Sequence, residues 1–185
     1  MLLDITLKLT PKEADEAWNH TDRSLVGHLG THFDVMEQVF PLEYTRREGI
    51  VWDVSAVRGR DIDIADIDEC ALQRGQFVAF YTGYLEEVGY GNKTYFADHP
   101  QLSDALITRL LDAGVSIIGI DCAGVRRGAE HTLTDRRCAA CGTFVVENLC
   151  GLKAVLDCGG RFTAHTYPLN YSGVTGLPCR VLAEV

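Results

Sequence analysis

The most informative stretch of this chain is Gly27-His28-Leu29-Gly30-Thr31-His32-Phe33-Asp34. Its two histidines are four residues apart, and a carboxylate follows the second one two residues later. Side chains alternate between the faces of an extended strand, so His32 and Asp34 are expected to share a face, which His28 would join. Two imidazoles and a carboxylate form a facial ligand set for zinc, manganese or iron that leaves positions for water. The pattern therefore predicts a divalent metal site.

The residues between these ligands suit that interpretation. Gly30 allows a close approach of the backbone, and the hydroxyl of Thr31 can support a ligand through a hydrogen bond. The competing interpretation is a solvated loop in which Asp34 hydrogen-bonds a histidine, because such spacings also arise by chance. Spacing alone does not decide between the two.

Composition and charge exclude several classes of protein. The 185 residues carry a formal charge of −9, and 46% of them are hydrophobic. This length suits one domain, residues 1–185, and the acidic balance argues against a nucleic-acid partner. No apolar run is long enough to cross a bilayer, and the start Met1-Leu2-Leu3-Asp4 does not resemble a signal peptide. We therefore expect a cytoplasmic protein without a membrane partner.

The seven cysteines are expected to be reduced in that compartment. Cys138 and Cys141 have the spacing of a zinc or redox pair, and Cys150 with Cys158 would complete a four-thiolate site. No second closely spaced pair follows, however, and the segment also has the pattern of an amphipathic helix. The favoured interpretation is that they are small packing residues, which is where free cysteine usually lies.

Hydrophobic periodicity and turn residues divide the chain into strands and helices. Strands are predicted over 2–9, 50–57, 76–81, 115–120, 143–146, 161–167 and 179–183. Helices are predicted over 11–19, 64–73, 103–112 and 132–141, several with capping residues at their ends. The glycine-rich stretch after residue 81 is expected to be a loop. This order indicates an α/β fold with a mixed sheet packed against helices.

Several motifs, taken in order, resemble those of one known family. The run from His28 to Asp34 is similar to the His-x-Gly-Thr-His-x-Asp signature of the metal-dependent cyclases, which include bacterial kynurenine formamidases and isatin hydrolases. The supporting segments are Leu3-Asp4-Ile5-Thr6, Phe80-Tyr81-Thr82-Gly83-Tyr84, Gln101-Leu102-Ser103, Gly119-Ile120-Asp121, Val146-Glu147-Asn148-Leu149, Pro168-Leu169-Asn170 and Gly176-Leu177-Pro178-Cys179-Arg180. Ordered matches over nearly the whole chain are far more specific than any single motif.

The resemblance implies a swivelling β/β/α domain that forms a homodimer or a larger homo-oligomer. It also implies a one- or two-metal hydrolytic centre, with zinc as the first expectation and manganese as the alternative. His28, His32 and Asp34 match metal ligands of the family, and Glu147 matches its distal carboxylate ligand. The implied reaction is hydrolysis of a carbon–nitrogen bond in a small-molecule amide, either an arylformamide or a cyclic amide, through a metal-bound hydroxide.

The chain departs from the family pattern in its N-terminal stretch, where Asp15-Glu16-Ala17-Trp18-Asn19 replaces a segment that packs on the substrate of kynurenine formamidases, and at two positions near the metal centre. Gln38 stands where the family has a proton-shuttle histidine, and glutamine cannot exchange protons near neutral pH. Glu37 is the nearest titratable substitute, although strand alternation favours a surface position for it. Asp135 stands where the family has its second-metal histidine, and His131 lies four residues earlier on the same helical face. Glu37, Gln38 and His131 are thus the catalytic candidates. Either His131 or Asp135 is expected to complete the metal centre.

Other functions remain compatible with these residues. A member of the same family could hydrolyse a lactone or catalyse a dehydration. A catalytically degenerate protein that binds a metal or a ligand without turnover is favoured by Gln38. A structural zinc protein is a weaker alternative, because structural zinc sites prefer closed shells rich in cysteine.

Overall fold

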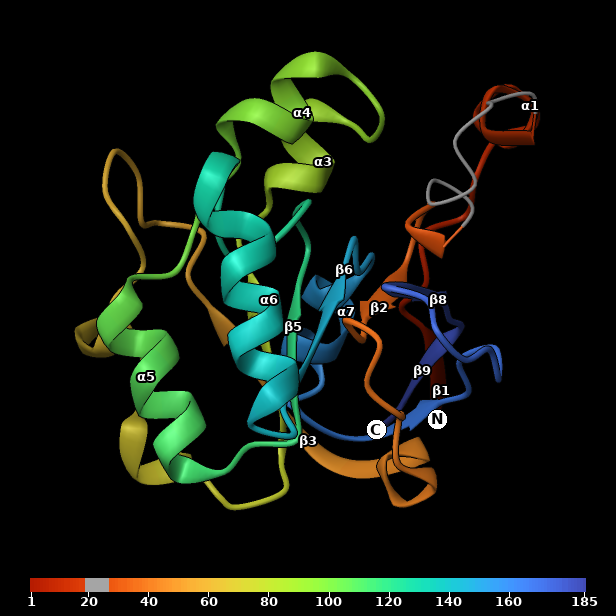
Figure 1. Cartoon of the computed structure of the whole chain (residues 1–185). Helices are drawn as coiled ribbons and strands as arrows, with labels where there is room; N and C mark the ends of the chain where they lie inside the picture. Colours follow the sequence, from red (N-terminus) through yellow and green to blue (C-terminus); the bar gives the residue numbers. More distant parts are fainter. Residues whose placement is uncertain (19–26) are drawn as a thin grey trace.

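A computed structural model describes residues 1–18 and 27–185 (Figure 1). Its described part contains one sheet of nine strands in the order β1-β9-β7-β3-β4-β5-β6-β2-β8. The strands are β1 (Leu2–Asp4), β2 (His32–Asp34), β3 (Arg46–Asp53), β4 (Phe77–Tyr81), β5 (Ile117–Ile120), β6 (Phe144–Glu147), β7 (Arg161–Thr166), β8 (Gly176–Pro178) and β9 (Val181–Glu184). The helices are α1 (Pro11–Trp18), α3 (Tyr84–Val88), α4 (Lys93–Asp98), α5 (Asp104–Ala113), α6 (His131–Ala140) and α7 (Leu152–Asp157).

The sheet is mixed and strongly curled. Strands β3, β4, β5 and β6 are parallel and form its centre, whereas the strands on either side of them pair antiparallel. Only Cys179 and Arg180 separate β8 from β9, although these strands lie near opposite ends of the strand order. A bridge between Thr6 and Leu149 also joins the segment after β1 to the segment after β6. The two ends of the sheet therefore approach each other.

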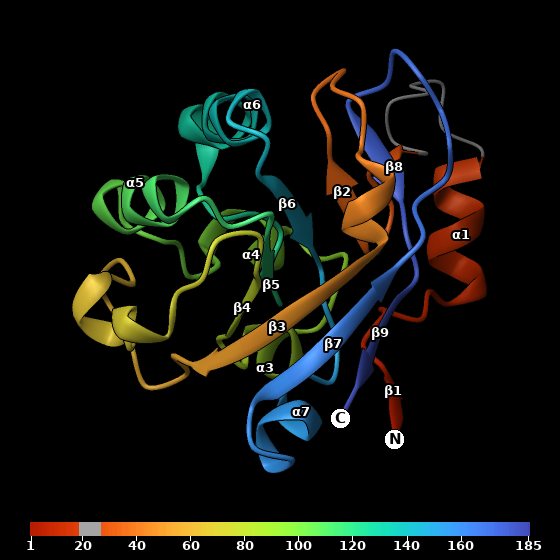
Figure 2. The same ribbon diagram turned by 90° about the horizontal axis from the view of Figure 1, so that it is seen from below.

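This curl separates two hydrophobic cores. In the central strands alternate residues face opposite ways, so Val51 and Ala79 point into the curl while Ile50 and Val78 point towards the helices. Helices α5 and α6 cover that outer face, and Figure 2 shows them on one side of β4, β5 and β6 with the curled strands on the other. The outer core includes Leu106, Ile107 and Leu110 from α5 and Cys138 from α6.

The α/β class with a mixed sheet packed against helices is confirmed, and two local predictions are wrong. The segment 64–73 does not form one helix but two short 3-10 turns, Ile64–Asp66 and Glu69–Ala71. Each turn is capped by its own aspartate, because Asp63 accepts a hydrogen bond from Ile64 N and Asp68 accepts one from Cys70 N. Such side-chain bonds to nearby backbone compete with a continuous helix.

The glycine-rich stretch after β4 is not a loop but carries α3 and α4. Asn92 caps α4 by accepting a hydrogen bond from Tyr95 N, and the ring of Tyr95 is fully buried. Helices as short as α3 and α4 are not stable through helix propensity alone, and packing of such aromatic residues stabilises them. The predicted helix 11–19 is present as α1, and its last predicted residue, Asn19, lies outside the described residues.

Two further expectations concern membranes and cysteines. No helix in the described ranges 1–18 and 27–185 is long and apolar enough to cross a membrane. All seven cysteines are free. Cys138 is buried in the outer core as expected, whereas Cys141 and Cys158 are exposed, so the expectation that they are packing residues is wrong for these two. Among the described residues no cysteine belongs to a cluster that could hold a metal ion.

Candidate metal centre

Strand pairing brings distant residues onto the face of the sheet that α6 covers. Strand β2 pairs antiparallel with β6, so that His32 lies opposite Glu147 and Asp34 lies opposite Val145. Directly opposed residues share a face, and Val145 belongs to the core beneath the helices. The side chains of His32, Asp34 and Glu147 consequently lie on the helix side, while Phe33 points into the curl.

Helix α6 contributes two more side chains to this place. His131 and Asp135 are one turn apart, so they share a helical face. His131 Nε2 lies 3.4 Å from Asp135 Oδ2 and 3.5 Å from Glu147 Oε1. Its Nδ1 lies 3.1 Å from the carbonyl oxygen of Arg126, which can only accept a hydrogen bond. Nδ1 therefore holds the proton, and Nε2 faces the carboxylates with a free lone pair.

His28 reaches the same point from the turn before β2. Its Nδ1 lies 3.1 Å from Asp34 Oδ1 and 3.2 Å from His32 Nε2, while its Nε2 contacts the hydroxyl of Thr175 at 2.9 Å. This position depends on Gly176, since a Cβ atom there would lie only 2.7 Å from His28 Cε1. The glycine that begins β8 thus leaves room for the imidazole.

The converging atoms form two groups that share one carboxylate. His28, His32 and Asp34 make the first group, and Asp34, His131, Asp135 and Glu147 make the second. Within each group one ligand atom from every residue lies within 4.8 Å of the others. The first group offers two nitrogens and one oxygen to an ion, and the second offers three carboxylate oxygens together with the nitrogen of His131.

Burial of three carboxylates in one place has an electrostatic cost. Asp34, Asp135 and Glu147 are all almost fully buried. Burial raises the pKa of Asp135 and of Glu147, and the neighbouring charge of Asp34 raises both further. Burial also opposes ionisation of Asp34, but the imidazoles of His32 and His28 outweigh it and lower its pKa. For His32, burial lowers the pKa, and attraction to Asp34 outweighs it and raises the pKa overall.

The donor set fits a divalent cation. Four carboxylate oxygens are buried and accept no hydrogen bond from the described residues 1–18 and 27–185: Asp34 Oδ1 and Oδ2, Asp135 Oδ2 and Glu147 Oε1. Unpaired buried carboxylate oxygens are costly, and cations are their usual remedy. The nearby Arg136 does not supply one, because its guanidinium pairs with Glu37 at 2.9 Å. Histidine nitrogens and carboxylate oxygens together suit zinc or manganese.

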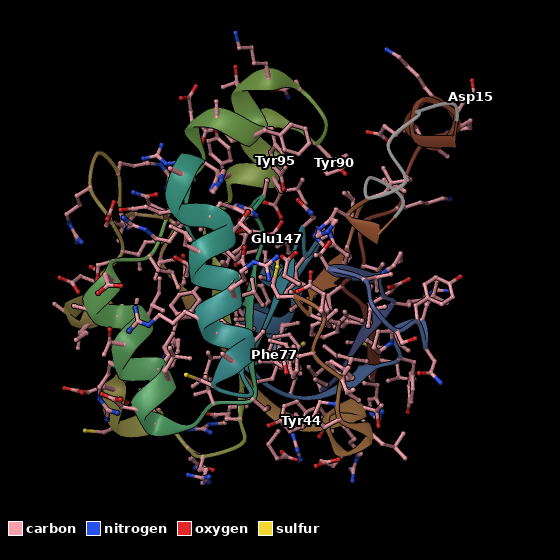
Figure 3. All side chains as sticks on the ribbon, viewed as in Figure 1. Asp15, Tyr44, Phe77, Tyr90, Tyr95 and Glu147 are labelled. Atoms are coloured by element: carbon pink, nitrogen blue, oxygen red, sulfur yellow. The ribbon has the colours of Figure 1, made fainter. Side chains whose placement is uncertain are left out.

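A cavity of about 520 Å³ opens onto this cluster. Besides the cluster itself, its walls include Tyr90, Phe96, Leu29, Met36 and Ala123, with Glu13 of α1 at one side. Figure 3 shows Tyr90 and Tyr95 beside α4, with Glu147 below them next to α6. The cavity is therefore largely apolar and partly aromatic, with the metal-binding side chains in its wall.

The structure brings together most, but not all, of the predicted site residues. His28, His32, Asp34, His131 and Glu147 line the cavity, and Asp135 is buried and belongs to the second group. The sequence left His131 and Asp135 as alternatives, and both contribute an atom to that group.

Glu37 and Gln38 lie elsewhere. The Glu37 side chain is 50% exposed and paired with Arg136, and Gln38 is exposed. Neither is among the residues that line the cavity. The chain turns away after β2 through left-handed backbone at Met36 and Glu37, with φ angles of 46° and 64°.

Sequence reasoning missed the wall of the cavity. Tyr90 lies between Gly89 and Gly91, and its hydroxyl accepts a hydrogen bond from Gly30 N at 2.9 Å. Asn148 lies next to Glu147 and hydrogen-bonds the Gly30 carbonyl. The only signal was the presence of an aromatic residue among glycines and of an amide beside a predicted ligand. Neither pattern identifies its partner.

The chain belongs to the cyclase family. Residues 3–127 match the family model described as "Putative cyclase", a range that includes the run from His28 to Asp34. A search among curated proteins finds no match.

Solved structures share the fold over almost the whole chain. One is described as a potential metal-dependent hydrolase with cyclase activity, with a TM-score of 0.77, 24% identity and coverage of 99% of this chain and 96% of that one. A predicted metal-dependent hydrolase from Bacillus stearothermophilus has a TM-score of 0.75, 22% identity and coverage of 99% and 97%. Isatin hydrolase A from Ralstonia solanacearum has a TM-score of 0.77, 18% identity and coverage of 99% and 91%.

Proposed function

We propose that this protein is a metal-dependent hydrolase that cleaves the carbon–nitrogen bond of a small amide. The observation that carries the proposal is the convergence of imidazole nitrogens and unpaired, buried carboxylate oxygens in the wall of an apolar cavity. Membership of the cyclase family and the shared fold with proteins described as metal-dependent hydrolases support it.

Two metal positions would share Asp34. His28 Nδ1 and His32 Nε2 would hold the first ion together with Asp34, because these atoms face one another at 3.1–3.6 Å. Asp34, Asp135 and Glu147 would hold the second. Zinc suits the nitrogen-rich position, and manganese suits the oxygen-rich one at least as well. A divalent ion bound here supplies Lewis-acid activation of water and of an amide carbonyl.

His131 is the residue that we assign to proton transfer. Its side chain is 30% exposed, whereas those of Asp135 and Glu147 are almost fully buried, and it lines the cavity. Because Nδ1 donates to Arg126 O, Nε2 is free to accept a proton. In this proposal a water molecule attacks the amide carbonyl and loses a proton to His131 Nε2. The same proton then passes to the leaving nitrogen as the carbon–nitrogen bond breaks.

The cavity walls favour a substrate with a planar apolar group. Tyr90 and Phe96 contact each other edge-on, with ring centroids 5.9 Å apart, and both line the cavity. Aromatic side chains hold flat rings through such contacts. Several of the structures with this fold are isatin hydrolases, and isatin is itself a cyclic amide on an aromatic ring. An arylformamide or an aromatic cyclic amide is therefore the substrate class that we propose. We also propose that the enzyme is a homo-oligomer.

The test combines metal analysis with a substrate screen. Purified protein is loaded with zinc or manganese and assayed against arylformamides, cyclic amides and lactones. We expect hydrolysis of an amide that falls more than about 100-fold in His32→Ala, since even residues that only support metal ligands typically cost 10–100-fold. His165→Ala is the matched control, because His165 lies on β7, pairs with Glu184 of β9 and is not among the residues that line the cavity.

Three outcomes would contradict the proposal. If only lactones are hydrolysed, the bond that the enzyme cleaves is an ester and not an amide. Metal binding without any turnover would indicate a ligand-binding protein. Retention of amide hydrolysis in His32→Ala would remove the metal centre from the reaction.

A further inference from the structure

His32 can bind an ion only through the nitrogen that faces the cluster. Its Nε2 lies 3.2 Å from His28 Nδ1 and 3.6 Å from both Asp34 Oδ1 and Glu147 Oε2. A neutral imidazole has one N–H and one free lone pair, so Nε2 binds a cation only in the tautomer that keeps its proton on Nδ1. What stabilises that tautomer therefore governs the ligand.

The group that stabilises it is the carbonyl of Gly30. His32 Nδ1 lies 2.9 Å from this oxygen, and because a carbonyl only accepts, the hydrogen bond requires a proton on Nδ1. The same oxygen also accepts a hydrogen bond from Asn148 Nδ2 at 2.8 Å. On the other side of the residue, Gly30 N donates to the hydroxyl of Tyr90 at 2.9 Å.

Asn148 is itself held in one orientation. It is buried, with 2% of its surface exposed, and its φ angle of 57° is a left-handed value that asparagine tolerates better than most residues. The hydroxyl of Tyr95 donates to Asn148 Oδ1 at 2.7 Å, which leaves the NH2 group facing Gly30. The hydroxyl of Thr31 donates to the main-chain carbonyl of Asn148 at 2.7 Å.

We infer that Asn148 is a positioning residue for the metal centre and acts on His32 through the Gly30 carbonyl. This inference rests on the proposed metal site but not on the reaction that the site catalyses. The Asn148 amide fixes the direction of the carbonyl, and the carbonyl fixes the protonated nitrogen and the ring plane of His32. Partners that orient a ligating histidine in this way typically contribute 10–100-fold to metal affinity.

The first measurement needs no variant. In metal-free wild-type protein, at a pH high enough for the His32 imidazole to be neutral, nitrogen NMR of the imidazole rings reports which nitrogen of His32 carries the proton. We expect the Nδ1–H tautomer. A predominant Nε2–H tautomer would overturn the inference, because the hydrogen bond to Gly30 would then be absent.

The second measurement uses Asn148→Asp, which keeps the size of the side chain and tolerates the left-handed backbone but replaces the donor by an acceptor. Calorimetric titration with zinc alone or manganese alone should show affinity reduced about 10- to 100-fold. The NMR spectrum of the metal-free variant should show more of the Nε2–H tautomer. Tyr95→Phe is the control, since it removes the hydroxyl that supports Asn148 but leaves the donor to Gly30, and its affinity should fall less.

A third variant keeps the test decisive if Asn148→Asp does not fold. Asn148→Gly accepts the φ angle without strain and also lacks the amide, so it should show the same direction of change. Wild-type affinity and tautomer in a folded Asn148→Asp or Asn148→Gly would overturn the inference. These results are distinct from a failure of the proposed function, in which the wild-type protein would itself bind no metal or hydrolyse no amide.

Discussion

His131 and Glu37 are two titratable residues of the candidate site whose side chains have different surroundings. The imidazole of His131 lies in the cavity wall with Nε2 towards Asp135 and Glu147. The carboxylate of Glu37 lies outside the cavity and pairs with Arg136. A group can transfer protons to a substrate only from within hydrogen-bond reach of it. His131 in the cavity wall meets this condition, and Glu37 outside the cavity does not.

This difference predicts unequal effects of two conservative substitutions. His131→Gln should lower kcat by about 10²- to 10⁴-fold, the usual contribution of a positioned acid or base. Glu37→Gln should leave kcat within a few fold, because it removes only a half-exposed ion pair of about 0–1 kcal/mol. Steady-state kinetics on the best amide substrate measure both. Equal losses in the two variants would contradict the assignment of His131.

Helix α6 is the element that turns a three-ligand site into a larger one. Strand β2 and the turn before it supply His28, His32 and Asp34 from one short segment. Asp135 comes from α6 and Glu147 from the end of β6, and both meet Asp34 in the second group. Four oxygens of these three buried carboxylates have no hydrogen-bond partner in the described part of the chain, and two dications would offset their charge.

The number of bound ions tests the role of α6. Asp135→Asn keeps the shape of the side chain but removes a negative charge, so the protein should bind one equivalent of metal where the wild type binds two. Elemental analysis after equilibrium dialysis measures this ratio. Asp157→Asn, on α7 and paired with Lys153, is a control that should keep two equivalents. If Asp135→Asn binds as many equivalents as the wild type, Asp135 does not hold an ion. Two equivalents in both proteins would place the second ion elsewhere, and one equivalent in both would show that there is no second ion.

The sequence predicts which residues within one element lie close together better than it predicts which elements pair with each other. His28, His32 and Asp34 are close in the chain, so spacing alone suggested a common site. The opposition of His32 and Glu147 depends on the pairing of β2 with β6, which periodicity does not specify. The resemblance to a family supplied Glu147 instead. Tyr90 and Asn148 were missed because their partner, Gly30, is fixed only by tertiary structure.

Across the whole molecule, the curl of the sheet encloses one core and presents the other face to α5 and α6. The sequence predicted buried strands over 115–120 and 143–146 because apolar residues run through them, but it did not predict that the central strands are parallel. It did not predict the short helices α3 and α4. Burial of Tyr84 and Tyr95 in the outer core stabilises these two helices. Local propensity is weak for such short helices, so packing decides them.

The stability of the whole fold should depend on pH through His99. This residue is 1% exposed, and burial lowers its pKa to about 4. The unfolded chain takes up a proton near pH 6.5, so folding stability is lost as the pH falls from about 6.5 towards 4. The loss attributable to His99 is on the order of 3 kcal/mol.

Urea unfolding of metal-free protein between pH 4 and pH 7 measures this dependence. His99→Gln should show a shallower loss of unfolding free energy over that range than the wild type, because it lacks the titrating imidazole. Curves that run parallel for the two proteins would show that His99 titrates alike in the folded and unfolded states.

The central claim is that His28, His32 and Asp34 hold a divalent metal. The most direct test is anomalous diffraction, at the zinc absorption edge, from a crystal of the zinc-loaded protein. We predict a peak about 2.0–2.2 Å from His28 Nδ1, His32 Nε2 and an oxygen of Asp34. Full zinc loading without a peak between these three side chains would contradict the account.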